Sequence, residues 1–142
     1  MRILKGTAAV CVSMVVIDLI WLGMVAEDLY NDQLGPLKAQ PVIVPAAALF
    51  YIQYVAVIVG FAVLPAKRIK DAAIRGLGIG WVAYATYELT NWAVIQGWPA
   101  TLVPIDIAWG LALTTLVATF GRLAAGPPHS DLETGQAEHA PT

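Results

Sequence analysis

The chain has 142 residues, of which 58% are hydrophobic and only 13% are charged, and its mean hydropathy is +0.69. A soluble domain usually has about a quarter of its residues charged, so this composition indicates a protein surrounded mostly by lipid. The net charge of -2, with eight basic residues, excludes a cationic surface for nucleic acid. We therefore expect membrane lipids, and no nucleic acid, around this protein.

Four apolar stretches follow one another along the chain, at about residues 5–26, 42–64, 72–95 and 100–122. Each has about 22 residues, or about 33 Å of helix, which is enough to cross a hydrocarbon core of about 30 Å. Gly and Pro separate the stretches, as in Leu34-Gly35-Pro36. The sequence therefore predicts an all-α membrane protein, with a four-transmembrane-helix bundle in residues 1–123.

The basic residues predict how this bundle is oriented. Those on one side of the predicted membrane are Arg2, Lys5, Lys67, Arg68, Lys70, Arg75 and Arg122. Only Lys38 lies on the other side. Because cytoplasmic loops carry the excess of Lys and Arg, both termini are expected in the cytoplasm. Residues 124–142 are rich in Pro, Gly, Ser and acids, which predicts a disordered cytoplasmic tail.

Three acids lie inside the predicted spans: Asp18, Glu88 and Asp106. An ionised carboxylate at the centre of a membrane costs about 2.5 to 3.5 kcal/mol, so we expect all three to face the interior of the bundle. The helical rise places each of them roughly 9 to 12 Å below the outer boundary. The acids therefore share one layer, which predicts a single polar cluster.

The helix faces that carry these acids also carry small and aromatic residues. On the third span, Gly76 and Gly80 continue at helical spacing to Glu88, so the face that lets a neighbour approach closely also presents the acid. We expect Trp92 and Trp98 at the membrane interface instead. The candidate proton-binding or ligand-binding residues are Asp18, Glu88, Asn91, Asp106, Trp21, Tyr84 and Trp109.

Other kinds of site find no support in the spans. Cys11 is the one cysteine, so no disulfide can form within the chain, and both histidines lie in the predicted tail. The spans contain no Ser–His pair, no cluster of metal ligands and no phosphate-binding loop. We therefore expect no catalytic residue, no bound metal and no cofactor.

Three strings carry a resemblance to a known family: Asp18-Leu19-Ile20-Trp21-Leu22-Gly23, Tyr87-Glu88-Leu89-Thr90-Asn91 and Asp106-Ile107-Ala108-Trp109-Gly110. They resemble the signature segments of the small bacterial membrane proteins catalogued as domain of unknown function 2177. The likeness runs from about residue 1 to about residue 122. An aspartate is common in that family at the position of Glu88, so the carboxyl here is displaced by about a methylene. The resemblance implies a multi-pass protein of the bacterial inner (cytoplasmic) membrane and no established activity.

Two interpretations of the acids remain open. In the structural one, they accept hydrogen bonds that hold the helices together, although such pairs average only about 0.6 kcal/mol in membranes. In the functional one, burial and mutual repulsion favour the uptake of a proton or a cation, with Glu88 as its holder. The functional interpretation predicts proton- or cation-linked binding or transport of a small molecule.

Two other classes of function stay as alternatives. One is a non-catalytic accessory or assembly subunit of a membrane complex, and the last in rank is a lipid-modifying membrane enzyme that uses the carboxyls as acid and base. Four helices enclose little volume, so we expect a transporter of this size to work as a homodimer or in a larger membrane complex.

Overall fold

The computed structural model describes residues 1–39 and 41–128, which form helices and turns with no strand. The elements are α1 (Arg2–Ile20), η1 (Trp21–Val25), α2 (Glu27–Leu34), η2 (Gly35–Leu37), α3 (Val44–Val57), η3 (Ile58–Val63), α4 (Ile69–Val94) and α5 (Leu102–Ala125). Most of the predicted tail, residues 129–142, lies outside the described residues.

Three helices in the described part of the chain are long and apolar enough to cross a membrane: Arg2–Val25, Val44–Val63 and Leu102–Ala125. They coincide with the first, second and fourth predicted spans. The third predicted span, residues 72–95, coincides with α4, which has 26 residues. Its composition is more polar than that of the other three, because it includes Arg75, Glu88 and Asn91 among its residues.

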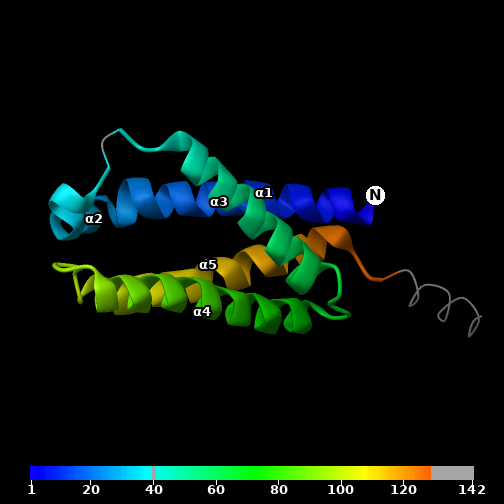
Figure 1. The fold of residues 1–142 in the computed structure, drawn as a ribbon. Coiled ribbons are helices and arrows are strands. Elements are labelled where there is room, and N and C mark those ends of the chain that lie inside the picture. Colours follow the sequence, from blue (N-terminus) through cyan, green and yellow to red (C-terminus); the bar gives the residue numbers. More distant parts are fainter. Residues whose placement is uncertain (40, 129–142) are drawn as a thin grey trace, which may run out of the picture.

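α4 and α5 form an antiparallel hairpin, α1 lies along α5, and α3 crosses over this layer at an angle (Figure 1). Glycines set the distance between the two helices of the hairpin. A Cβ atom on Gly76 would lie 2.7 Å from the backbone oxygen of Thr114, and one on Gly80 would overlap the backbone of Gly110. The small-residue face predicted for the third span is therefore the contact face with α5.

α2 is a helix that the sequence analysis did not predict. It lies at the end of the bundle that also holds the connection between α4 and α5 (Figure 1). Its first turn contains Glu27 and Asp28, which favour a helix N-terminus, and it ends at Gly35, whose φ of 44° suits glycine. The hydroxyl of Thr101 donates a hydrogen bond of 2.6 Å to the side chain of Gln33 and so joins α2 to the start of α5.

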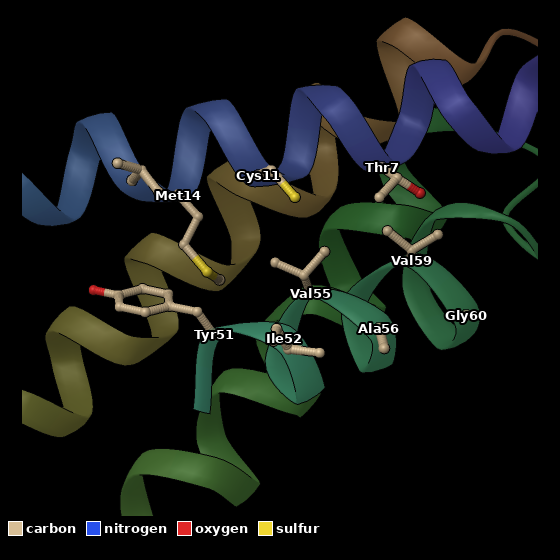
Figure 2. Close-up of a pocket in the computed structure, with 10 residues that line it drawn as sticks. Thr7, Cys11, Met14, Tyr51, Ile52, Val55, Ala56, Val59 and Gly60 are labelled. Atoms are coloured by element: carbon tan, nitrogen blue, oxygen red, sulfur yellow. The ribbon is translucent and has the colours of Figure 1, made fainter. Parts of the chain in front are cut away.

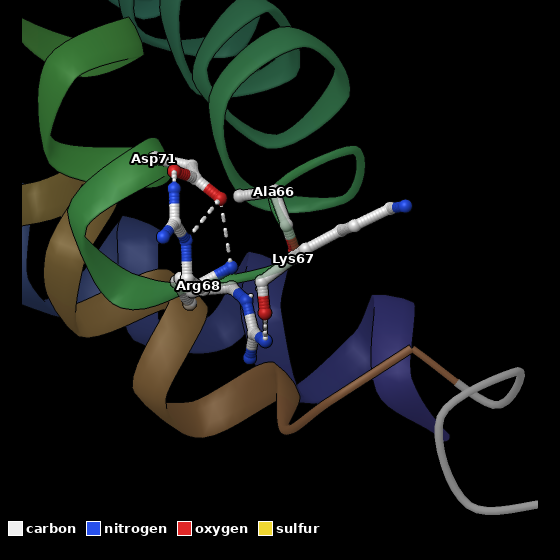
Figure 3. A network of polar contacts seen from close by, with 5 residues as sticks. Ala66, Lys67, Arg68 and Asp71 are labelled. Carbon is white, nitrogen blue, oxygen red and sulfur yellow. Dashed lines mark hydrogen bonds and ion pairs between the residues drawn. The ribbon is translucent and has the colours of Figure 1, made fainter. Parts of the chain in front are cut away.

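At the opposite end of the bundle, arginines satisfy backbone carbonyls that the helix ends leave free. The buried Arg122 donates to the carbonyl oxygens of Ala66 at 2.9 Å, Lys67 at 2.6 Å and Gly126 at 2.6 Å. Beside it, Arg68 and Asp71 form an exposed ion pair of 3.0 Å at the start of α4 (Figure 3). Hydrogen bonds from Arg68 lower the pKa of Asp71 below its ordinary value.

Candidate functional site

Glu88 and Asp106 bring two carboxyl groups together between α4 and α5. The side chain of Glu88 is completely buried, and that of Asp106 is 7% exposed. The two carboxyls lie close enough to share a hydrogen bond when one of them carries a proton. The glycine contacts described above hold their helices at this short separation. We call Glu88 and Asp106 the carboxyl pair.

Each acid of the carboxyl pair accepts a hydrogen bond from a residue outside α4 and α5. The indole N–H of Trp98, in the connection before α5, donates to Oε2 of Glu88 at 3.0 Å. The hydroxyl of Tyr30, on α2, donates to Oδ1 of Asp106. Burial and this bond raise the pKa of the Tyr30 phenol, so Tyr30 stays a donor. The other oxygen of Glu88, Oε1, is buried and has no donor among the described residues.

Asp18 has a different partner from the carboxyl pair. It is 7% exposed and accepts a hydrogen bond from the hydroxyl of Tyr51 on α3. Tyr51 also lines an apolar groove of about 520 Å³ between α1 and the α3–η3 segment, together with Cys11 and Met14 (Figure 2). Tyr51 therefore belongs both to the lining of that groove and to the surroundings of Asp18.

Aromatic side chains pack against one another near the acids. Trp21 and Trp109 stack with their ring centres 4.2 Å apart and their planes 8° from parallel. The indole N–H of Trp21 lies 3.4 Å from the hydroxyl of Tyr30, which bonds Asp106. Tyr84 packs over Gly110, where any larger residue would overlap its ring. Within the predicted set, the two tryptophans and Tyr84 thus lie beside the acids.

The predicted acids have different hydrogen-bond partners in the structure. Glu88 and Asp106 lie together, whereas Asp18 bonds a tyrosine on another helix. Asn91 is half-buried, and within residues 1–39 and 41–128 its side chain makes no hydrogen bond to the acids. Trp98, which the sequence placed at the membrane interface, is a direct partner of Glu88.

The sequence analysis missed two of the groups that bond the acids, Tyr30 and Trp98. Tyr30 belongs to the segment between the first and second predicted spans, which was treated as a loop. Its signal was the pair of acids Glu27 and Asp28 before it and Gly35 after it, a pattern that marks the two ends of a short helix. The positive φ of Gly97 turns the chain immediately before Trp98.

The two carboxyls suit a proton or a small cation better than a metal ion that needs several protein ligands. Among the described residues, no group of three or more His, Cys, Asp or Glu side chains could hold a metal ion. Two ionised carboxylates about 4 Å apart would repel each other by about 4 kcal/mol at an effective dielectric constant of about 20. A proton shared by the pair, or a cation between them, removes this repulsion.

The comparisons with known proteins give a family and no activity. A family model described as a predicted membrane protein (DUF2177) matches residues 3–123. No curated protein and no solved structure matched the chain. The matched region contains the carboxyl pair, Tyr30, Trp98 and both stacked tryptophans.

Proposed function

This chain belongs to the DUF2177 family of predicted membrane proteins, and from that premise we propose that the carboxyl pair binds a proton or a small cation. Binding at the pair is linked to the binding or transport of a small molecule through the membrane. Glu88 is the holder, and Asp106 is the group that shares or balances the charge. Tyr30 and Trp98 orient the two carboxyls.

One observation carries this proposal: the buried Oε1 of Glu88 has no donor among the described residues although a second carboxyl lies beside it. A purely structural polar contact would be expected to satisfy each buried oxygen, because an unsatisfied one costs about 1 to 3 kcal/mol. Here the buried carboxyl of Glu88 keeps one oxygen without a donor and lies beside a second carboxyl, that of Asp106. A proton or cation at this position supplies the missing partner.

The proposal includes a membrane topology of four spans, with α4 as the third. The polar residues of α4 that reduce its apolarity include Glu88, which is buried against α5 and not exposed to lipid. Arg2 reaches the carbonyl oxygens of Leu64 and Gly126, so the N-terminus, the α3–α4 connection and the end of α5 meet at one basic end. By the positive-inside rule this end is cytoplasmic, in a bacterial inner membrane.

Unfolding in nanodiscs tests the proposal over a range from acidic to alkaline pH, with and without sodium or potassium. A pair that is protonated in the folded chain and ionised in the unfolded chain takes up a proton on folding, so stability falls as pH rises. A pair that binds a cation is instead stabilised by that cation through mass action. In both cases Glu88→Gln and Asp106→Asn remove the dependence.

Asp32→Asn is the matched control, because Asp32 is an exposed acid on α2 at the same end of the bundle. It is expected to leave the pH and cation dependence of the parent unchanged. If the parent shows neither dependence, or if Glu88→Gln retains it, the carboxyl pair does not bind a proton or cation. The accessory-subunit alternative would then be tested by isolating partner proteins from native membranes.

A further inference from the structure

A second groove lies on the other side of α3, between the α3–η3 segment and α4. It has a volume of about 620 Å³. Its lining residues are Tyr54, Val57, Phe61, Arg75, Gly78, Ile79, Val82 and Ala83. It exists because α3 crosses the bundle at an angle and makes few close contacts with α4 (Figure 1). The lining is apolar along its length, and Arg75 is its one charged residue.

Arg75 lies toward the basic end of the bundle, near the start of α4. Its side chain is exposed, and its Nη1 donates to the backbone oxygen of Phe61 at 3.2 Å. A guanidinium has five N–H donors, so several remain for another acceptor. The nearby acid Asp71 is already bonded to Arg68 by two side-chain contacts of 3.0 and 3.4 Å. The mouth of the groove is therefore positively charged.

We propose that this groove binds an anionic phospholipid, with one acyl chain along Gly78 and the phosphate bonded to Arg75. An apolar channel ending in a guanidinium is complementary to a fatty chain joined to a negative headgroup. Arg binds phosphate through its planar fork of N–H donors. Neither Glu88 nor Asp106 contributes to this site, so the proposal is independent of the function proposed above.

Gly78 provides room for the acyl chain. A Cβ atom at this position would meet no other atom within 4 Å, in contrast to the neighbouring Gly76 and Gly80, which pack against α5. A leucine at position 78 therefore fills the groove without disturbing the α4–α5 contact. Gly60 is also open but lines the other groove, between α1 and the α3–η3 segment, so it offers a matched control.

Native mass spectrometry of the detergent-purified protein tests the proposal. Phosphatidylglycerol and phosphatidylcholine with identical acyl chains are titrated separately against the parent and four variants. The parent should prefer phosphatidylglycerol by about fivefold to tenfold, and Arg75→Gln should abolish this preference. Gly78→Leu should weaken binding of both lipids. Lys5→Gln, at an exposed basic residue of the same end, and Gly60→Leu should bind as the parent does.

Four results would overturn the proposal. The first is a retained preference for phosphatidylglycerol in Arg75→Gln, and the second is an equal loss in Lys5→Gln, which would indicate general attraction to the basic end. The third is unchanged binding of both lipids in Gly78→Leu. Glycerol 3-phosphate, the headgroup without acyl chains, should not compete at equal concentration. Competition by it would mean that Arg75 binds free phosphate and that the groove has no part in recognition.

Discussion

Trp98 donates its indole N–H to Oε2 of Glu88 at 3.0 Å, and this bond ties the connection between α4 and α5 to the carboxyl pair. The ring of Trp98 also makes an edge contact with Tyr87, with the ring centres 5.7 Å apart. The other oxygen of Glu88, Oε1, has no donor among the described residues. Trp98 therefore orients the carboxyl that we propose as the holder.

Replacing Trp98 with Phe keeps an aromatic ring against Tyr87 but removes the N–H donor. Because both oxygens of the buried Glu88 then lack a donor, we expect a loss of about 1 to 2 kcal/mol in the free energy of unfolding. Unfolding in mixed micelles with increasing dodecyl sulfate measures this free energy. Trp92→Phe is the control, since Trp92 is exposed near the end of α4 and makes no hydrogen bond to Glu88. Equal losses in the two variants would contradict the bonding role.

Tyr30 connects α2 to Asp106, and Tyr30→Phe removes only the hydroxyl that makes this bond. Losing a hydrogen bond to a charged carboxyl costs about 1.5 to 3 kcal/mol. Without this bond, α2 should open more often. Amide hydrogen exchange in residues 27–34 should then be faster by about tenfold or more. Tyr87→Phe, which alters a half-exposed phenol on α4, should leave exchange in these residues unchanged.

Gly80 and Gly110 meet where α4 and α5 are closest, so Gly80→Ala forces the two helices apart. Overpacking of this kind costs about 1 to 3 kcal/mol. Gly78→Ala, two positions earlier, adds its methyl group to open space and should be neutral or stabilise the helix by up to about 1 kcal/mol. Chemical unfolding of both variants measures the difference. Equal stabilities of the two variants would show that the fold tolerates a larger distance between α4 and α5.

Arg122 holds three carbonyl groups at the basic end, and a shorter side chain cannot reach all of them. Arg122→Gln should therefore destabilise the fold by about 2 to 4 kcal/mol through unsatisfied buried carbonyls. Lys67→Gln serves as the control, because the exposed Lys67 side chain at the same end makes none of these bonds, only its backbone oxygen accepting from Arg122. A stability of Arg122→Gln equal to that of the control would contradict this role.

The sequence predicted the four long helices to within about three residues because their bounds follow from hydropathy and from Gly and Pro at the breaks. It also predicted that Asp18, Glu88 and Asp106 are buried, since an ionised group facing lipid is costly. The contact face of α4 followed from the spacing of Gly76 and Gly80. These properties depend on residues close together in the chain.

The partners of the acids could not be predicted in the same way. Tyr30 is 76 residues from Asp106, and its position depends on how α2 folds back over the end of the bundle. Depth alone placed the three acids in one layer, but depth does not fix the direction in which each helix face points. For that reason depth did not single out Tyr51 on α3 as the hydrogen-bond partner of Asp18.

Infrared spectroscopy of the carboxyl groups tests the central claim most directly, because protonated and ionised carboxyls absorb at different frequencies. We predict that the parent in nanodiscs at neutral pH, without added sodium or potassium, shows a band from a protonated carboxyl. The band should disappear in Glu88→Gln or Asp106→Asn and persist in Asp32→Asn. Sodium or potassium that binds in place of the proton should reduce the band. A parent that shows neither a protonated band nor any spectral response to these cations would contradict the claim that Glu88 and Asp106 bind a proton or cation.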